Sequence, residues 1–228
     1  MNKQNTMFAI GIPTINRADL LQESLEKYSK DFPNTPIYVV DNGGQIFDVS
    51  KFGDNIHFFY NNPNVGVATS WNQLCDAIFN GIPMVEKCQH ALILNDDIYL
   101  GKNEDEVKKF IIENNITLAS TTGTWCAFLL NNYIYSKVGS FDNNIFPAYF
   151  EDNDYAYRLQ LAGYPHTAHE FLNPEIYRNS QTIAKDSSLN ANFEKNKNYY
   201  IQKWGGEPYK ETFLTPFNQI RNYKEFGI

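Results

Sequence analysis

The sequence predicts an α/β protein whose central sheet is mostly parallel. Short apolar runs alternate with segments whose apolar residues recur at helical spacing, which is the rhythm of βαβ units. These runs are apolar at every position, which is typical of strands that helices cover on both faces. The chain has 228 residues, a length that suits one domain with a sizeable core.

The first half of the chain contains four apolar runs with the length of strands. They comprise residues 8–12, 37–40, 56–60 and 91–94. Two segments between these runs have helical spacing: the apolar stripe Leu20, Leu21, Leu25 and Tyr28, and residues 67–79. Strands joined through helices are expected to run parallel to one another.

The second half is expected to complete the sheet and to add a helical cap. Its elements are a helix that includes residues 107–111, strands at 116–119 and 125–130, an irregular segment at 141–150, and a helix at 151–162 that ends at Gly163. From residue 185 onward the chain is polar and rich in Asn and Lys. We expect one domain over residues 1–184 and a C-terminal helical extension, 185–228, packed on it.

Composition and charge limit the function classes. Apolar residues make up 43% of the chain and aromatic residues 15%, which excludes a disordered chain. The 26 acidic and 19 basic residues give a net charge of −7. This charge disfavours a nucleic-acid acceptor without excluding it, because the lysines of residues 185–203 can form a local basic face. A small, metal-complexed partner fits the charge better.

The cysteines and the hydropathy pattern favour a soluble, cytoplasmic protein. Cys75, Cys88 and Cys126 show no CxxC spacing, so neither a disulfide framework nor a zinc site is expected. The N-terminal apolar run is too short for a signal peptide. No stretch approaches the roughly 18 consecutive apolar residues of a membrane span.

Polar, turn-forming residues follow each strand that is expected in the first half. The four clusters are Pro13-Thr14-Ile15-Asn16-Arg17, Asp41-Asn42-Gly43-Gly44, Asn61-Asn62-Pro63-Asn64-Val65-Gly66 and Asn95-Asp96-Asp97. Parallel α/β sheets bind ligands in the crevice beyond the carboxyl ends of their strands. These clusters are therefore the first candidates for a binding site.

Asn95-Asp96-Asp97 places two carboxylates where a buried strand ends. Carboxylates are costly to desolvate there unless a cation or hydrogen bonds compensate them. Mg²⁺ and Mn²⁺ favour one or two carboxylates together with phosphate oxygens and water, so this short cluster suffices if a diphosphate supplies the remaining ligands. The structural alternative is that Asn and Asp end the strand in a turn.

Glu151-Asp152-Asn153-Asp154 places three acids at the start of a helix. The helix dipole favours negative charge there by about 0.3–1 kcal/mol, which explains one or two of them. Tyr149 and Phe150 precede them, and aromatic surroundings raise the pKa of a carboxyl group and make it a better proton acceptor near neutral pH. Asp154 and Arg158 are spaced i, i+4, so an ion pair is expected between them.

Two further positions allow both a functional and a structural interpretation. Asp41 can accept hydrogen bonds from a nucleobase or ribose, or it can open the turn that follows it. Asn64-x-Gly66 can offer backbone N–H groups to an anion, or it can be an ordinary helix start. The four histidines show no catalytic or metal-binding spacing, and Cys126 has apolar neighbours without an evident base. We interpret all five of these side chains as structural.

Five motifs in this order resemble the family-two glycosyltransferases of GT-A fold, and most closely their rhamnosyltransferase-like members. The motifs are Ile12-Pro13-Thr14-Ile15-Asn16-Arg17, Val39-Val40-Asp41-Asn42-Gly43, Asn64-Val65-Gly66, Leu94-Asn95-Asp96-Asp97 and Phe150-Glu151-Asp152-Asn153-Asp154. The resemblance covers residues 8–182. It implies a Rossmann-like nucleotide-binding sheet with flanking helices. It also implies an inverting hexosyl- or pentosyltransferase that moves a sugar from a nucleotide diphosphate donor, usually a UDP- or dTDP-sugar, to the hydroxyl of a glycan or another acceptor.

The resemblance also implies roles for individual residues. Asp97 matches the ligand of a Mn²⁺ or Mg²⁺ ion, Asp152 matches the general base that deprotonates the acceptor, and Glu151 is the second candidate for that base. The donor-binding positions are Pro13, Thr14, Asn16, Arg17, Asp41, Asn42, Asn64, Gly66, Asn72, Asn95 and Asp96. Trp125 and Tyr149 are expected on the acceptor side, where an aromatic ring can stack on a sugar.

The chain departs from the family pattern at one metal-binding position. Many relatives have a His after the catalytic helix, where this chain has Arg178. Either the ion has fewer protein ligands, or Arg178 joins the donor site and neutralises the diphosphate directly. The alternative function is a catalytically silent module that binds a nucleotide sugar or a glycan on the same fold, because a fold does not by itself establish chemistry.

Overall fold

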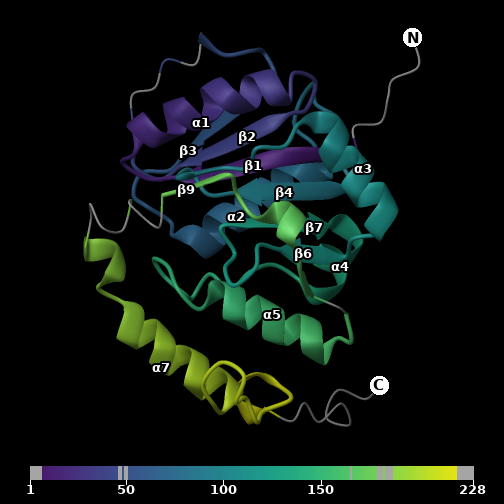
Figure 1. Cartoon of the computed structure of the whole chain (residues 1–228). Coiled ribbons are helices and arrows are strands. Elements are labelled where there is room, and N and C mark those ends of the chain that lie inside the picture. Colours follow the sequence, from purple (N-terminus) through teal and green to yellow (C-terminus); the bar gives the residue numbers. More distant parts are fainter. Residues whose placement is uncertain are drawn as a thin grey trace.

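A seven-stranded sheet with helices on both faces forms the centre of the computed structural model (Figure 1). The structure describes residues 7–45, 48, 51–164, 166–178, 182 and 187–219. The strand order is β3-β2-β1-β4-β7-β6-β8, and a separate antiparallel pair joins β5 (Ile98–Tyr99) to β9 (Ile176–Tyr177). The expected boundary between residues 184 and 185 lies outside the described residues.

The strands and helices expected in the first half are present, and further elements follow in the second half. The strands of the large sheet are β1 (Phe8–Thr14), β2 (Ile37–Asp41), β3 (Ile56–Tyr60), β4 (His90–Leu94), β6 (Leu118–Ser120), β7 (Ala127–Asn131) and β8 (Thr167–Ala168). The helices are α1 (Ala18–Asp31), α2 (Val67–Asn80), α3 (Glu104–Asn114), α4 (Asn132–Val138), α5 (Glu151–Leu161) and α7 (Phe193–Trp204). Short 3-10 turns lie at Glu170–Leu172, Ser187–Asn190 and Pro216–Asn218.

The sheet is parallel in its first half and mixed in its second. β1 pairs in parallel with β2 and β4, and β2 pairs in parallel with β3. β7, in contrast, runs antiparallel to both β4 and β6. Only residues 121–126 connect β6 to β7, and a connection of that length joins antiparallel neighbours. Because β1, β2 and β4 run parallel to one another, their carboxyl ends meet at one edge of the sheet.

Alternating strand residues bury two apolar layers, one on each face of the sheet. Phe8, Ile10 and Ile12 of β1 pack with apolar side chains of α1 and α3. Ala9, between them, packs with α2, α4 and α5. β1, β2 and β4 are buried almost throughout, as their apolar composition predicts. β3 is only partly buried because it lies at the edge of the sheet.

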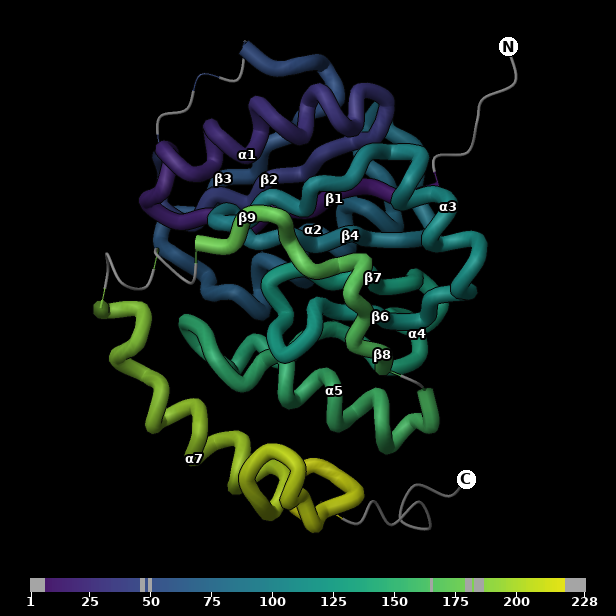
Figure 2. Tube along the Cα trace, viewed as in Figure 1, coloured from purple at the N-terminus to yellow at the C-terminus, as the bar shows by residue number. Residues whose placement is uncertain are grey.

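Helix α7 packs against α5 on the side away from the sheet (Figure 2). Tyr157 of α5 contacts Trp204 of α7, with 5.0 Å between the ring centroids, and Tyr200 of α7 is fully buried in the same cluster. Within the described part of the chain, no helix combines the length and apolar content that crossing a membrane requires.

Two features of the second half differ from the sequence prediction. Helix α4 was not expected, because its tyrosines and polar residues give no apolar stripe; the Asn131 side chain caps it by accepting a hydrogen bond from the N–H of Tyr133 (2.7 Å). Trp125 was expected at the start of a strand, but β7 begins at Ala127. The Thr124 hydroxyl accepts from the N–H of Cys126 (3.1 Å), a local turn that keeps Trp125 out of the ladder.

Candidate active site

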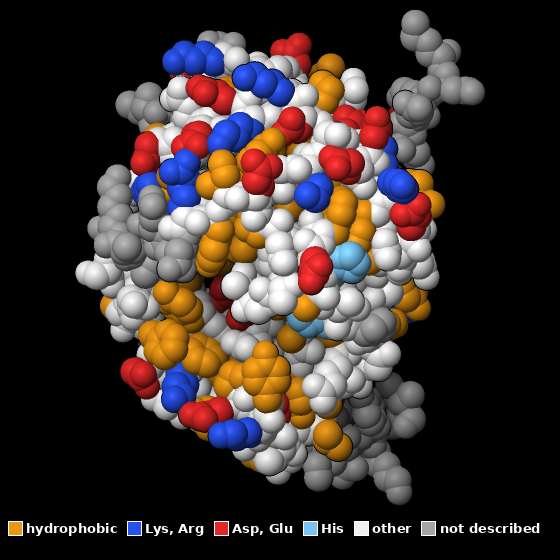
Figure 3. Space-filling view, in the orientation of Figure 1, with side chains coloured by type: hydrophobic (Ala, Val, Ile, Leu, Met, Phe, Trp, Pro, Cys, Tyr) orange, Lys and Arg blue, Asp and Glu red, His pale blue; other side chains and the backbone are white. Residues whose placement is uncertain are grey.

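One cavity of about 280 Å³ lies where the strand ends of the first half face the loop before α5. Figure 3 shows a hollow on this face of the molecule, with acidic side chains at its floor and hydrophobic side chains along its lower border. The cavity brings together twelve of the predicted site residues. They are Pro13, Thr14, Asn42, Asn64, Gly66, Asn95, Asp96, Asp97, Trp125, Tyr149, Glu151 and Asp152.

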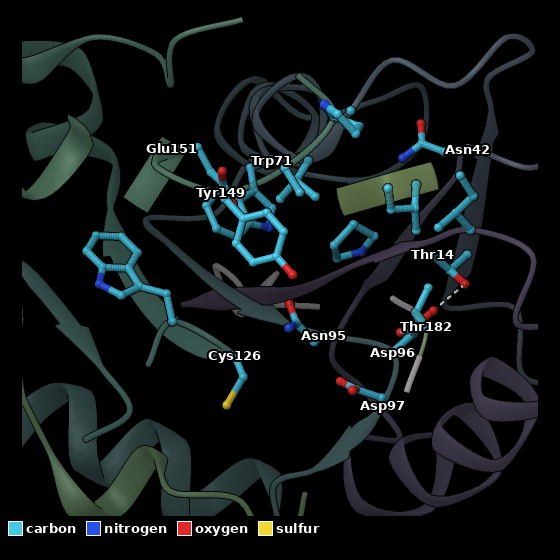
Figure 4. A pocket seen from close by; sticks show the side chains of 18 of the residues that line it. Thr14, Asn42, Trp71, Asn95, Asp96, Asp97, Cys126, Tyr149, Glu151 and Thr182 are labelled. Atoms are coloured by element: carbon cyan, nitrogen blue, oxygen red, sulfur yellow. Dashed lines mark hydrogen bonds between the residues drawn. The ribbon is translucent and has the colours of Figure 1, made fainter. Parts of the chain in front are cut away.

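The cavity has two acidic sides. In Figure 4, Asp96 and Asp97 lie on one side and Glu151 on the other, with Tyr149 and Asn95 between them. Asp96 and Asp97 follow the end of β4, and Glu151 is the first residue of α5. Fifty-three residues lie between Asp97 and Glu151, so only the tertiary fold brings these two sides to one cavity.

Asp96 and Asp97 are both almost fully buried at the end of β4. Asp96 Oδ2 accepts a hydrogen bond from Thr14 Oγ1 at the end of β1 (2.6 Å), and Thr182 Oγ1 lies 3.5 Å from Asp96 Oδ1. Burial raises the pKa of Asp96 to about 7, and the negative charge of Asp97 acts in the same direction. The hydrogen bond from Thr14 and the charge of Arg17 oppose this rise. Two adjacent buried carboxyl groups thus line the cavity, where the loss of water disfavours their charged forms.

The donor set of this acidic pair fits a hard divalent cation that also binds a diphosphate. Carboxylate oxygens are the ligands that Mg²⁺ and Mn²⁺ prefer, and a cation would offset the desolvation of Asp96 and Asp97. Among the described residues no group of three or more His, Cys, Asp or Glu side chains forms a complete metal site. Asp96 and Asp97 would thus form part of the coordination shell of such a cation, with phosphate oxygens and water as further ligands.

The loop before α5 has a strained backbone that hydrogen bonds hold in place. Tyr149 and Phe150 have φ angles of 75° and 78°, a left-handed conformation that is costly for non-glycine residues. Asn196 of α7, which is 1% exposed, donates its side-chain Nδ2 to the carbonyls of Phe146 (3.1 Å) and Ala148 (2.8 Å). The hydroxyl of Tyr149 consequently points into the cavity (Figure 4).

The start of α2 holds the same loop from its other side. The N–H of Val67 donates to the carbonyl of Pro147 (2.8 Å), and the N–H of Gly66 donates to Asn64 Oδ1 (2.8 Å). A Cβ atom on Gly66 would lie 2.8 Å from the ring of Phe146, so this close approach requires glycine. The N–H groups of Gly66 and Val67 are thus engaged within the protein.

Glu151 and Asp152 form the acidic start of α5. Glu151 is 7% exposed, and its Oε2 accepts no hydrogen bond from the described part of the chain. Burial, followed by the charge of Asp152, raises the pKa of Glu151. Asp152 is half-buried and accepts a hydrogen bond from the N–H of Asn153 (2.8 Å); burial raises its pKa as well. Both groups line the cavity and bind protons more readily than an exposed acid.

Asp154, the third acid of this helix start, has a structural role. Its carboxylate accepts from Arg158 Nε (2.9 Å), which confirms the ion pair expected from their spacing. It also pairs with Lys203 Nζ (2.6 Å) and accepts from the indole N–H of Trp204 (2.8 Å) on α7. Asp154 therefore ties α5 to α7 while Glu151 and Asp152 face the cavity.

Four predicted donor-binding residues do not line the cavity but contact residues close to it. Asp41 accepts from the N–H groups of Gly43 (2.8 Å) and Gln45 (2.6 Å), so it opens a turn after β2. Asn72 exchanges two hydrogen bonds with the backbone of Phe141, at 2.9 and 2.7 Å. The side chain of Asn16 packs against Gly43. Arg17 forms an ion pair with Asp19 at 2.9 Å. Their contacts with a donor stay predictions.

Arg178, the fifth predicted donor residue outside the cavity, forms an ion pair with Glu23 of α1. Its backbone N–H donates to the carbonyl of Asp97 (3.1 Å), so β9 is attached to the strand end that carries the acidic pair. Tyr177, its neighbour, lines the cavity. A direct contact between the guanidinium and a diphosphate stays a prediction.

Several cavity residues were not predicted as site residues. Besides Tyr177 they include Ile15, Val67, Trp71, Thr124, Cys126, Pro147, Ala148, Thr182 and Leu189. Thr124 directly precedes Trp125, and residues 147–148 directly precede Tyr149, so both positions are next to predicted site residues. Asn196, which holds the loop, stands in a polar tail where neither spacing nor composition marks it.

Comparison with known proteins finds similarity both in sequence and in structure. No protein-family model matches the chain. Over 126 residues the chain is 30% identical to a galactofuranosyl glycosyltransferase of Leishmania donovani. That match covers 54% of this chain and 28% of the relative, so the chain spans little more than a quarter of that protein.

The structure is similar to that of the mannosyltransferase PcManGT from Pyrobaculum calidifontis, solved in complex with GDP-Man and Mn²⁺. The TM-score is 0.63 at 11% identity, and the match covers 91% of this chain and 67% of that one. At this identity the likeness concerns the fold. The predicted fold class, a single α/β domain of GT-A type with flanking helices, is confirmed.

Proposed function

We propose that this protein is a glycosyltransferase that moves a sugar from a nucleotide diphosphate sugar to an acceptor hydroxyl with inversion at the anomeric carbon. The single observation that supports this proposal is the cavity itself, in which the acidic pair Asp96 and Asp97 faces the acidic start of α5. The similarity to a galactofuranosyl glycosyltransferase and to a mannosyltransferase agrees with this assignment.

The side of the cavity formed by the strand ends is the donor side in this proposal. Pro13, Thr14, Asn42 and Asn95 surround the nucleotide, and Asp97, with Asp96 beside it, holds a Mn²⁺ or Mg²⁺ ion on the diphosphate. When bound, the ion stabilises the negative charge that develops on the leaving diphosphate. The structural relative was solved with GDP-Man, so GDP joins UDP and dTDP among the nucleotides to test.

The side formed by the loop and α5 is the acceptor side. Asp152 accepts the proton of the acceptor hydroxyl while the hydroxyl oxygen forms a bond to the anomeric carbon. The bond between that carbon and the diphosphate oxygen breaks, and the nucleoside diphosphate leaves with the electron pair. Tyr149 and Trp125 line this side and offer aromatic faces to the acceptor sugar.

Glu151 has a supporting role. Its raised pKa keeps it protonated at neutral pH, so it adds no second negative charge beside Asp152. Asp152 is less buried and is the better candidate for the group that cycles between protonated and ionised forms. Because a single back-side displacement takes place at the anomeric carbon, the reaction inverts the configuration of the donor sugar.

A thermal-shift screen combined with a turnover assay tests this proposal. UDP, dTDP and GDP are added with and without Mn²⁺, and one of them is expected to stabilise the protein by about 2.7 kcal/mol at 100 times its dissociation constant. Asp152→Asn is expected to keep this stabilisation and to lower turnover by about 10²–10⁴-fold, whereas Asp105→Asn, an exposed acid on α3, is the matched control.

Two results would contradict the proposal. If no nucleotide changes the melting temperature, the donor site is wrong. If nucleotides bind but Asp152→Asn has the turnover of the wild type, the general base is wrong. Nucleotide binding without any turnover by the wild type would favour a silent binding module on the same fold.

A further inference from the structure

A second hollow, of about 530 Å³, lies between α5 and the segment that follows α7. Asn153, Tyr157, Gln160 and Tyr164 form one wall, at spacings that place them along one face of α5 and its C-terminal end. Tyr209, which is 94% exposed, stands on the opposite wall. We call this hollow the α5 groove.

The segment opposite α5 is firmly attached to α7. The N–H groups of Thr212 and Phe213 donate to the carbonyl of Trp204 at 3.0 and 2.9 Å. The Tyr157 hydroxyl crosses from α5 and donates to the carbonyl of Phe213 (3.0 Å). A Cβ atom on Gly206 would lie 1.9 Å from the carbonyl oxygen of Lys210, so this tight turn requires glycine. The groove thus has two fixed walls.

The α5 groove is next to the cavity of the candidate active site. Asp152 lines the cavity, and its neighbour Asn153 lines the groove. Trp125 lines the cavity and contacts His166, which lines the groove; their ring centroids are 5.0 Å apart. The two hollows are therefore neighbours across Trp125 and His166, and the groove adjoins the side of the cavity where Asp152 lies.

The chemistry of the groove suits an uncharged, hydroxyl-rich ligand. Four tyrosines and two carboxamides are among its described lining residues, which include no Lys or Arg. Tyr157 and Tyr200 are buried, so Tyr164 and Tyr209 are the rings that a ligand can reach. Phenol rings offer flat apolar faces, while Asn153 and Gln160 can each donate and accept hydrogen bonds. The one acid, Glu211, already accepts a hydrogen bond from the Tyr200 hydroxyl. Among the described lining residues a polyanion would find no Lys or Arg, whereas a sugar can place its C–H face on a ring and its hydroxyls on the amides.

We propose that the α5 groove binds the distal sugars of an oligosaccharide acceptor whose terminal hydroxyl reaches Asp152. This inference rests on the proposed function, since it names the acceptor class of the same site. The volume lies within the range of about 300–1,000 Å³ that is typical of small-molecule sites, so the groove adds binding area beyond the cavity. The acceptor is then an oligosaccharide rather than a free monosaccharide.

An array of defined neutral oligosaccharides, probed with the full chain, tests this inference. The groove variant combines Gln160→Ala with Tyr209→Ala, two exposed side chains whose loss leaves the core intact. The control is Tyr60→Ala, an exposed aromatic residue at 55% on the edge strand β3. We expect the wild type and the control to retain a common set of oligosaccharides and the groove variant to bind them at least tenfold more weakly.

A kinetic comparison follows with the best-retained oligosaccharide. The ratio of kcat/KM for this oligosaccharide to kcat/KM for the matching monosaccharide glycoside is expected to fall at least tenfold in the groove variant. Equal ratios in the variant and the wild type would overturn the inference, and so would an array on which the wild type retains no oligosaccharide.

Failure of this inference is distinguishable from failure of the proposed function. Stabilisation by a nucleoside diphosphate and Mn²⁺ reports on the donor side alone and shows that the groove variant is folded. If that stabilisation and turnover are present but the ratio is unchanged, only the groove is wrong. If oligosaccharides bind in the groove but no sugar is transferred to them, the proposed function is wrong and so is the acceptor role.

Discussion

The two acidic sides of the cavity are held in place by different means. Asp96 and Asp97 follow β4, which is hydrogen-bonded to β1 on one side and to β7 on the other. Glu151 and Asp152 follow a loop that pairs with no strand and that contains two strained residues. Side chains and N–H groups from α2 and α7 hold that loop from outside.

This difference shows which parts of the chain each side depends on. The donor side is built from strand ends, so the core of the sheet fixes its geometry. The acceptor side depends on α7, which is far along the sequence and packs on α5 through Tyr157, Tyr200 and Trp204. Changes in α7 should therefore alter the acceptor side and leave the donor side nearly unchanged.

Among the changes that compare the two sides, the largest effect is expected from removing a charge on the donor side. Asp97→Asn keeps the size of the side chain but removes the carboxylate that is proposed to hold the metal. We expect the Mn²⁺-dependent part of the stabilisation by a nucleoside diphosphate to disappear and turnover to fall by roughly 100-fold or more. Thermal shifts with and without Mn²⁺ measure the first effect. Asp105→Asn is the control, and an unchanged response to Mn²⁺ in Asp97→Asn would remove this residue from the metal site.

An intermediate effect is expected from loosening the acceptor side. Asn196→Ala leaves the carbonyl of Ala148 without this donor and leaves the carbonyl of Phe146 with Asn192 alone, which should lower the free energy of unfolding by about 1–3 kcal/mol. Hydrogen exchange should quicken in residues 141–150 and turnover should fall by about tenfold, while stabilisation by a nucleoside diphosphate is retained.

The matched control for this change is Asn192→Ala. Asn192 donates to the same carbonyl of Phe146 (3.1 Å), but it is only partly buried, so its loss should cost less than about 1 kcal/mol. If both variants lose the same stability, or if Asn196→Ala weakens nucleotide binding as much as turnover, the two sides are not independent.

The smallest expected effect concerns the pH dependence of stability. Glu151 has a raised pKa in the folded protein, so the folded state binds more protons than the unfolded state between the ordinary pKa of Glu and the raised value. The free energy of unfolding should therefore fall as the pH rises through this window. Glu151→Gln cannot ionise and should be more stable than the wild type by about 1 kcal/mol or more at pH 8, with no such advantage at pH 4.

Chemical denaturation at several pH values measures this difference. A stability gap between Glu151→Gln and the wild type that does not grow with pH would mean that Glu151 is not held protonated by burial. The same variant sharpens the comparison between the two sides, because stabilisation by a nucleoside diphosphate and Mn²⁺ should be unaffected.

Local patterns predicted much of the donor side. The apolar runs of β1, β2 and β4 and the helical spacing of α2 were visible in the sequence, because burial on both faces leaves few positions for polar residues. The polar clusters after these strands identified Thr14 and the acidic pair as cavity residues. Asp41 was also singled out, but its bonds to Gly43 and Gln45 match the structural interpretation that the sequence left open.

The acceptor side was less predictable. The acids at 151–154 marked the helix start, and the i, i+4 spacing identified the bond between Asp154 and Arg158. The left-handed conformation of Tyr149 and Phe150 had no signal, because non-glycine residues adopt it only where surrounding contacts require it. The role of Asn196 was equally hidden, since a lone Asn in a polar helix does not indicate what it will contact.

The sequence by itself determined the strands, most of the helices and the chemistry available at the strand ends, because backbone preference and burial pattern act over a few neighbouring residues. Only the tertiary structure decided which of those groups meet. Thr14 reaches Asp96 across 82 residues, and Asn196 reaches Ala148 across 48. Such pairings depend on how whole layers pack, and packing is a property of the complete fold rather than of any segment.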